Sequence, residues 1–406
     1  MVKRRGASSV RRPRPKQGIV VAGHICLDLT PTFRGSEARR LADILTPGAL
    51  LVVGDCVVST GGAVANTGGA LARLGLDVGL MAKVGDDVFG RAVVDKVKEF
   101  ASARGLRVAR GESTSYTVVI SPPGVDRVFL HNPGTNDTFG ADDIDYDAVA
   151  RAGVFHFGYP PLMRRMYSGG GEELALTMRR AKEAGAITSL DLALPDPDSE
   201  AGRADWDAIL RKTLPHVDLF VPSIEEVLYC LDRGRFLAER AEAKARGVEL
   251  LETIATQDFS RLAGVLLGYG ALVVMLKAGR RGIYARTAAR ERLARSALDP
   301  ETWADRELWM PPFVVEKIAS ATGAGDCAIA GFLAGVAKGE GLESCLAYAA
   351  ACGAENLSAY DATSGVKSWS ETTRMLKGWR KVRIELGGDW RFDEEAGLWR
   401  GPSGRS

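Results

Sequence analysis

The sequence has 406 residues, of which 46% are hydrophobic and 26% are charged, and its formal net charge is +2. These values are typical of a soluble globular protein, and they argue against a disordered chain and against nucleic-acid or membrane partners. The six cysteines form no CxxC pair and the four histidines lack metal-ligand spacing, so we expect reduced thiols in a cytoplasmic protein and no zinc site.

The two ends of the chain differ from the middle. Residues 1–17 are basic and contain prolines, but they lack the apolar core of a secretory signal. We therefore expect a disordered basic tail, with a nucleic-acid-binding arm as the alternative. The main domain is predicted to span residues 18–370, and residues 371–406 are predicted to form a C-terminal extension.

Between these ends, short apolar runs alternate with amphipathic segments. The predicted strands are residues 19–23, 77–85, 153–159, 186–194, 218–223 and 271–279. The predicted helices are residues 61–75, 86–102, 171–185, 206–217, 224–231 and the stretch that follows Asp326. This alternation favours an α/β fold with a doubly wound, mostly parallel sheet covered by helices on both faces.

Two regions interrupt the alternation. Polar and apolar residues alternate within about residues 30–60 and 114–134, and the second region contains an SPPG turn, as hairpins do. These regions predict a small antiparallel β lid, which is also a candidate homodimer surface. Residues 234–253 predict a charged surface helix, and residues 286–312 predict a long, partly helical connection.

A glycine-rich turn, SATGAGDC at residues 320–327, precedes an apolar segment rich in alanine. Glycines let backbone N–H groups approach a ligand closely, and a helix N-terminus favours an anion. A carboxylate at Asp326 fits such a place if it takes a proton while the N–H groups hold the negative charge. The alternative is a tight turn in which Asp326 caps the helix.

Two segments resemble the signatures of the ribokinase-like, or PfkB, family of carbohydrate and nucleoside kinases. GGAVANTGGALARLG at residues 61–75 is similar to the first signature, and SATGAGDCAIAGFLAG at residues 320–335 is similar to the second. The resemblance covers about residues 18–367. It implies a ribokinase-like fold and an ATP-dependent kinase that transfers the γ-phosphate to a hydroxyl of a sugar or sugar derivative.

The resemblance also implies roles for individual residues. Asp326 matches the catalytic base, and the amides of Gly323, Ala324 and Gly325 match the anion hole. Positioning and charge stabilisation supply most of the catalysis in phosphoryl transfer, which suits such a site.

Four residues near the N-terminus match the acceptor site of the family. Asp28 matches a carboxylate that binds sugar hydroxyls, and Gly61 and Gly62 would let the backbone approach the sugar. Asn66 would donate to and accept from hydroxyls. The alternatives are a turn aspartate for Asp28 and a helix cap for Asn66.

The nucleotide side has three matches. Ser223 and Glu226 lie in VPSIEEV, where the family glutamate orders the water shell of Mg²⁺ and serine replaces the usual asparagine. A capping box explains this pair equally well, and both roles can coexist. Lys277, Gly279 and Gly282 match a turn that lines the nucleotide, with a solvated basic turn as the alternative.

Ser320 and Ala321 depart from the family pattern, which has an aspartate and a threonine there. The aspartate commonly helps to bind a monovalent cation, so its loss puts K⁺ activation in doubt. The alternative is that the later loop SAYDATSG, residues 358–365, offers carbonyls and Asp361 to the cation. A nucleoside kinase and a catalytically silent regulator remain as alternatives to a sugar kinase. A dinucleotide-binding domain is excluded because no GxGxxG follows the first strand.

Overall fold

The computed structural model describes residues 18–33, 46–122 and 128–404, so the predicted basic tail lies outside the described residues. Within these residues one sheet contains 11 strands. Their spatial order is β14 (Arg391–Asp393), β15 (Leu398–Arg400), β13 (Glu307–Met310), β12 (Ile283–Thr287), β11 (Val273–Lys277), β10 (Leu219–Phe220), β9 (Ile187–Leu190), β8 (Val154–Gly158), β1 (Ile19–Gly23), β4 (Val78–Gly85) and β5 (Leu106–Ala109).

The sheet is parallel from β5 to β11 and antiparallel from β11 to β14. All five residues of β1 and of β8 are buried, because strands in the middle of a parallel sheet are covered on both faces. The predicted doubly wound, mostly parallel sheet is confirmed. The strands β12 and β13 were not predicted, and β13 lies within the segment that the sequence presented as a partly helical connection.

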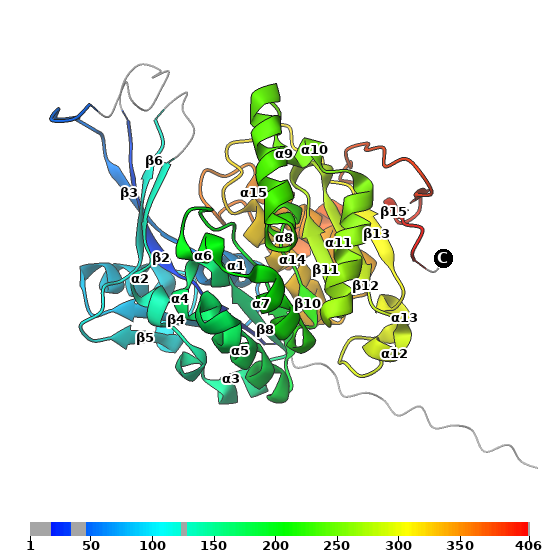
Figure 1. The fold of residues 1–406 in the computed structure, drawn as a ribbon, viewed down its shortest axis with the longest axis horizontal. Coiled ribbons are helices and arrows are strands. Elements are labelled where there is room, and N and C mark those ends of the chain that lie inside the picture. Colours follow the sequence, from blue (N-terminus) through cyan, green and yellow to red (C-terminus); the bar gives the residue numbers. More distant parts are fainter. Residues whose placement is uncertain (1–17, 34–45, 123–127, 405–406) are drawn as a thin grey trace, which may run out of the picture.

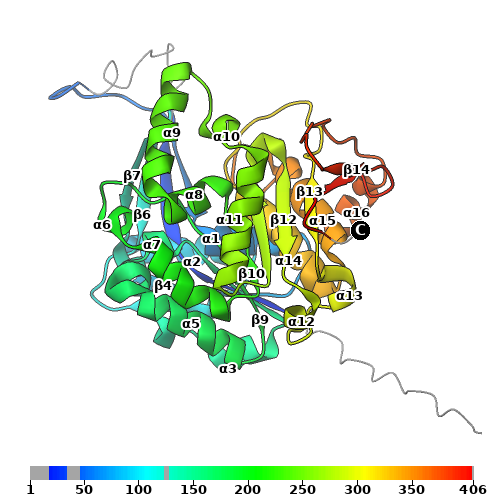
Figure 2. The same ribbon diagram turned by 45° about the vertical axis from the view of Figure 1, so that its right-hand side comes forward.

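Helices pack on both faces of this sheet (Figures 1 and 2). On one face α14 (Ala324–Lys338) contacts both α1 (Ala63–Arg73) and α15 (Leu342–Asn356). On the other face α7 (Trp206–Thr213) contacts α5 (Glu172–Glu183), α8 (Ile224–Leu231) and α11 (Thr256–Tyr269), and α8 also contacts α11. The remaining helices are α2 (Val88–Lys98), α3 (Tyr146–Arg151), α4 (Arg164–Tyr167), α6 (Glu200–Arg203), α9 (Arg233–Arg246), α10 (Leu250–Thr253), α12 (Arg290–Leu293), α13 (Pro300–Trp303) and α16 (Trp369–Leu376).

Small residues allow α14 to lie against α15. A Cβ on Gly331 would lie 2.3 Å from the Tyr348 carbonyl oxygen, and one on Gly335 would lie 2.8 Å from Sγ of Cys345. The two helices can approach this closely only because these positions have no side chain. The close packing fixes the N-terminal end of α14, where Asp326 lies.

A second sheet projects from the main body, at the upper left of Figure 1. Its order is β3 (Cys56–Gly61), β2 (Cys26–Pro31), β6 (Tyr116–Ile120) and β7 (Val128–Asn132). The outer pairs are antiparallel, and the central pair, β2 with β6, is parallel. We call this sheet the lid. Residues 34–45 and the second half of the predicted SPPG turn, Pro123 and Gly124, lie outside the described residues.

The segment predicted as a C-terminal extension adds strands to the main sheet, because β15 pairs with β13. The Trp390 ring lies on Tyr284 and Trp309, with ring centroids 6.1 and 5.9 Å apart. All six cysteines are free. No helix among the described residues is long and apolar enough to cross a membrane.

Candidate active site

Asp326 lies in the first turn of α14 and is only 5% exposed. The N-cap of this helix is Gly323, with φ 73°, so Asp326 does not cap it. A Cβ on Gly323 would lie 2.2 Å from the Ala362 carbonyl oxygen. The left-handed backbone and this close approach both require glycine. The first N–H groups of a helix have no partner within it, so this turn can receive an anion.

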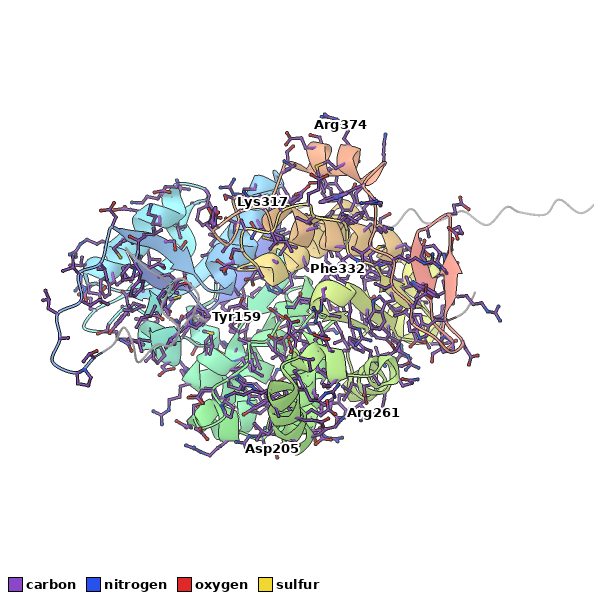
Figure 3. The ribbon with its side chains drawn as sticks, turned by 90° about the horizontal axis from the view of Figure 1, so that it is seen from above. Tyr159, Asp205, Arg261, Lys317, Phe332 and Arg374 are labelled. Carbon is purple, nitrogen blue, oxygen red and sulfur yellow. The ribbon has the colours of Figure 1, made fainter. Side chains whose placement is uncertain are left out.

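Three side chains donate hydrogen bonds to the Asp326 carboxylate. The Asn66 amide donates to Oδ2 at 3.0 Å, and the Thr67 hydroxyl donates to Oδ1 at 3.4 Å. The Tyr159 hydroxyl lies 2.8 Å from both oxygens. The structure thus joins two predicted residues, Asp326 and Asn66, and adds Thr67 and Tyr159, which were not predicted. Tyr159 lies near the middle of the molecule (Figure 3).

Lys277 forms a buried ion pair with Asp191, with Nζ 2.8 Å from Oδ1. Burial alone would lower the pKa of Lys277, but the Asp191 and Glu226 carboxylates outweigh burial and raise it. Burial, and then the charge of Glu226, raises the pKa of Asp191, although Lys277 opposes this shift. The Lys277 Cδ lies 3.7 Å from the position of a Cβ on Gly325, so this cation lies beside the glycine-rich turn.

Ser223 and Glu226 lie at the start of α8. The Ser223 backbone N–H donates to Oε2 of Glu226 at 2.7 Å. This hydrogen bond is one half of the capping box that the sequence indicated as the alternative for this pair. The described residues contain no group of three or more His, Cys, Asp or Glu side chains that could hold a metal ion. Glu226 is predicted to contact Mg²⁺ through water, which does not require a group of direct metal ligands. Its role therefore stays a prediction.

The backbone of the turn after β11 is enough to account for its two glycines, without contact to a ligand. Gly279 has φ 47° and Gly282 has φ 92°, which other residues rarely adopt. A Cβ on Gly282 would also lie 2.1 Å from the Met310 carbonyl oxygen. The turn therefore requires Gly282 for packing, and its contact with a nucleotide remains a prediction.

The predicted acceptor residues gather where the lid joins the main sheet. Asp28 lies in β2, and its carboxylate accepts a hydrogen bond from Sγ of Cys26 at 3.2 Å. Burial raises the pKa of Asp28. A Cβ on Gly61 would lie 2.2 Å from Oδ2 of Asp28, and one on Gly62 would lie 2.5 Å from Nδ1 of His24. Both glycines therefore admit neighbouring side chains of the protein itself.

Two histidines beside this region were not predicted. The His24 ring lies 5.3 Å from the His131 ring and 6.0 Å from the Tyr159 ring, measured between centroids. Burial, and then the nearby His131, lowers the pKa of His24 to about 3, so its ring stays neutral at physiological pH.

Ser320 is tied into the glycine-rich turn. Its hydroxyl donates to Oγ1 of Thr322 at 2.9 Å and accepts from the Thr322 backbone N–H at 3.1 Å. The Asn356 amide then links this turn to the next loop, because it donates to the carbonyl oxygens of Thr322 and Asp361. Hydrogen bonds thus hold the turn where the family pattern has an aspartate.

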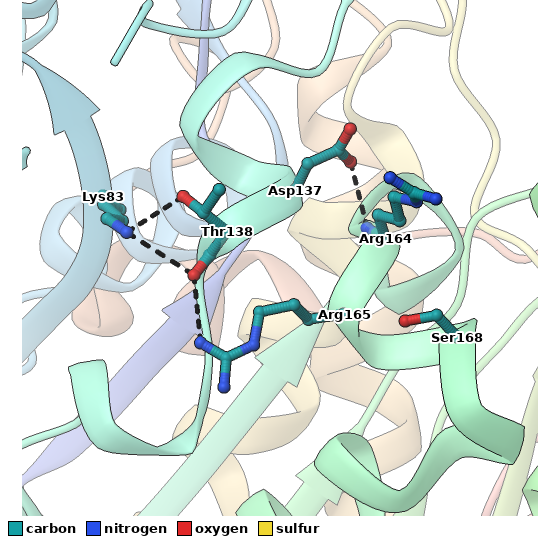
Figure 4. A pocket seen from close by; sticks show the side chains of 6 residues that line it. All are labelled: Lys83, Asp137, Thr138, Arg164, Arg165 and Ser168. Carbon is teal, nitrogen blue, oxygen red and sulfur yellow. Dashed lines mark hydrogen bonds between the residues drawn. The ribbon is translucent and has the colours of Figure 1, made fainter. Parts of the chain in front are cut away.

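A separate surface pocket of about 490 Å³ contains none of the predicted site residues (Figure 4). It is lined by Lys83, Asp137, Thr138, Arg164, Arg165 and Ser168. Each of its three cations pairs with a glutamate, namely Glu112, Glu200 and Glu173. Because these charges are balanced, the pocket is a poor candidate for an anion site.

The sequence was then compared with known proteins. The model of the family described as pfkB family carbohydrate kinase matches residues 16–369. The chain belongs to this family. An uncharacterized sugar kinase of Archaeoglobus fulgidus is 27% identical over 274 residues, which cover 67% of this chain and 88% of the relative. A fructokinase of Solanum tuberosum is 32% identical over 190 residues, which cover 45% of this chain and 55% of that enzyme.

Solved structures of sugar kinases share the fold of this chain. Arabidopsis thaliana ribokinase complexed with ribose and ATP has a TM-score of 0.66 and 17% identity, and the match covers 90% of this chain and 100% of the ribokinase chain. Xylella fastidiosa fructokinase with bound ATP has a TM-score of 0.64 and 22% identity, and the match covers 89% of this chain and 98% of the fructokinase chain. At these identities the likeness establishes the ribokinase-like fold alone. The family match and the sugar-kinase relative make the chain a sugar kinase of the PfkB family, a phosphotransferase.

Sequence signals for the missed residues were weak. Asp191 is an acid within an apolar run at the carboxyl end of a parallel strand, where open α/β sheets bind ligands. Thr67 lies next to Asn66 within the first signature. For Tyr159 the one signal was its place directly after β8, since nothing in the pattern aims its side chain at a residue 167 positions away.

Proposed function

We propose that this protein transfers the γ-phosphate of ATP to a hydroxyl of a sugar or sugar derivative, with Asp326 as the base. The observation that carries the proposal is a buried carboxylate in the first turn of α14, next to a glycine-rich N-terminus. Hydrogen bonds from Asn66, Thr67 and Tyr159 hold that carboxylate in place. A carboxylate fixed beside the acceptor site is placed to take a proton from the acceptor hydroxyl.

The proposed step conserves atoms and charge. Asp326 takes the proton of the acceptor hydroxyl as the acceptor oxygen bonds to the γ-phosphorus. The bond between that phosphorus and the bridging oxygen breaks, and ADP leaves with the electron pair. The amides of Gly323, Ala324 and Gly325 would stabilise the negative charge on the transferred group. Ala324 N–H also donates to the Ala321 carbonyl at 3.3 Å, so its share would be the smallest.

On the nucleotide side, we propose that Lys277 and Glu226 serve the phosphates and Mg²⁺. Lys277 supplies a positive charge beside Gly325, and Glu226 would order waters of the Mg²⁺ shell. When bound, Mg²⁺ supplies positive charge that offsets the charge developing on the phosphates. Ser223, Gly279 and Gly282 would shape the two turns on this side.

On the acceptor side, we propose that Asp28 binds hydroxyls of the sugar. Gly61 and Gly62, which already make room for the Asp28 and His24 side chains, would also let the backbone approach the sugar. Asp28 comes from the lid, whereas Asp326 comes from the main domain. An acceptor held between them would be shielded from water, which suppresses hydrolysis of ATP. Asn66 would contribute through Asp326, to which its amide donates.

We also propose that the lid forms a homodimer interface. The lid exposes large apolar side chains, with Val57 54%, Phe129 58% and Leu130 53% exposed. Phe129 and Leu130 are successive residues of β7, so exposed apolar side chains lie on both faces of the lid. Such exposed apolar surface is typical of an interaction site. Sedimentation analysis of Phe129→Asp against the native chain tests this, and a native chain that is monomeric at micromolar concentration would refute it.

A substrate screen tests the proposed function. ADP release with Mg²⁺–ATP would be measured against ribose, fructose, deoxy-keto acids, phosphosugars and nucleosides. We expect a sugar or sugar derivative to give the highest kcat/KM. A nucleoside as the best acceptor would replace the sugar proposal, and no turnover with any acceptor would favour a catalytically silent protein.

A further inference from the structure

Tyr159 lies at an unusual place in the backbone. It follows β8 directly and has φ 65° and ψ 42°, the left-handed region. Among the described residues, the other non-glycine residue with positive φ is Asp305. This conformation costs energy in any residue with a Cβ, and such strain clusters at functional sites.

The surroundings hold Tyr159 in this conformation. The Gly158 carbonyl accepts from the His24 N–H at 3.3 Å, and the Tyr159 carbonyl accepts from the Leu162 N–H at 3.0 Å. Pro160 and Pro161 then restrict the chain that leaves the residue. The fold therefore maintains a strained backbone at the one residue that places a phenol on Asp326.

The phenol contacts the carboxylate symmetrically, at 2.8 Å from each oxygen. A hydroxyl has one proton, so it can bond strongly to one oxygen at a time. Asn66 also donates to Oδ2 and Thr67 also donates to Oδ1, so each carboxylate oxygen has one further donor. An acceptor hydroxyl can thus bind one oxygen while the phenol keeps the other, without any movement of the Tyr159 backbone.

We propose that Tyr159 is a positioning residue that holds the Asp326 carboxylate facing the acceptor and yields one of its two oxygens when the acceptor hydroxyl arrives. This inference rests on the proposed role of Asp326 as base. The phenol stays protonated throughout, because burial, and then the Asp326 charge, raises the pKa of Tyr159 well above its usual range. It is therefore a hydrogen-bond donor and does not compete with Asp326 for the proton.

Several other ionisable groups act on this carboxylate or on the Tyr159 phenol, and all are present in every variant below. Asp191 follows β9, Lys277 ends β11, Glu226 lies in α8 and Cys327 is the next residue of α14. Because these groups are unchanged, a difference between variants that differ by one phenolic hydroxyl reports on that hydroxyl.

The test compares Tyr159→Phe with the native chain and with Tyr284→Phe as a matched control. Tyr284 is also buried and also donates to a carboxylate, Glu307, at 2.8 Å, but it lies in the antiparallel part of the sheet. The NMR spectra of protein labelled with ¹³C at the aspartate carboxyl carbon would be compared at one pH. The Asp326 signal is the one that disappears in Asp326→Asn.

We expect the Asp326 signal to move in Tyr159→Phe, because a hydrogen bond to its carboxylate is lost, and to stay in place in Tyr284→Phe. The kcat with the acceptor should fall by about tenfold or more in Tyr159→Phe, the contribution of one hydrogen bond to a charged group. The KM for ATP should not change. An unmoved signal in Tyr159→Phe, or an equal movement in the control, would overturn the proposal.

The two readouts separate this inference from the proposed function. A moved Asp326 signal in a protein that phosphorylates no acceptor would refute the kinase function while the contact between Tyr159 and Asp326 stands. A moved signal in an active enzyme whose kcat does not fall would refute the positioning role alone.

Discussion

At the scale of single residues, the candidate site is a buried group of opposed charges. The carboxylates of Asp326, Asp191 and Glu226 all act on the Lys277 ammonium, which is 14% exposed. Charges in such a place need partners, because taking a charge out of water is costly. Such a site would need positive charge to bind the phosphates and negative charge to bind a metal ion.

Asp28 gives the prediction that belongs to this scale. Asp28→Ala should raise the KM for the acceptor by about a hundredfold or more, since two hydrogen bonds to a charged group are worth roughly 1.5–3 kcal/mol each. The KM for ATP should change little, because Asp28 lies in the lid. Steady-state kinetics with each substrate varied in turn would measure this, and an equal change in both KM values would refute the assignment.

The sequence allowed prediction of some of these residues and not of others, for a physical reason. Asp326 and Asn66 lie in local glycine-rich patterns, and such patterns are visible in one sequence. Their hydrogen bond joins positions 260 residues apart, and the bond from Tyr159 spans 167. The crossovers of the sheet set those distances, so only the folded chain brings the residues together.

At the scale of elements, the central strands were predictable and the edge strands were not. Strands such as β1 and β8 are apolar along their whole length because helices cover both faces. The strand β14 has three residues, RFD, and two of them are exposed. Its pairing depends on β15 and β13 rather than on its own sequence. The helix α15 is apolar around most of its circumference, so it lacks the periodicity of an amphipathic helix.

The turn before α14 gives the prediction at this scale. Ser320 bonds to Thr322 where the family pattern has a carboxylate, so a monovalent cation would find a neutral oxygen there. Activity should therefore depend weakly on K⁺. Initial rates would be compared in K⁺ and in a bulky organic cation at matched ionic strength. A rise of tenfold or more on adding K⁺, about 1.4 kcal/mol in the transition state, would contradict this reading.

At the scale of the whole molecule, the sheet runs from β5 beside β4 to the C-terminal hairpin β14–β15. The hairpin covers part of the core, since Leu398 is fully buried and Trp390 lies on Tyr284 and Trp309. It is thus part of the folded domain, and the match to the family ends before it, at residue 369.

Removing the hairpin should destabilise the protein. Deletion of residues 389–406 should lower the free energy of unfolding by about 3–5 kcal/mol, as the loss of a large buried side chain does. Phe392→Ala is the control, because that ring is 42% exposed and should cost far less. Thermal unfolding would be followed by calorimetry. A deletion variant as stable as the full chain would show that the hairpin is an appendage.

The central claim is that Asp326 is the base of a sugar kinase, and turnover of Asp326→Asn with the best acceptor tests it most directly. The substitution keeps the size of the side chain and removes its capacity to take a proton. We expect kcat to fall by about 10²–10⁴-fold, the usual contribution of a general base. Binding of ATP, measured by calorimetry, should stay close to that of the native chain. A kcat within a few-fold of the native value would contradict the account.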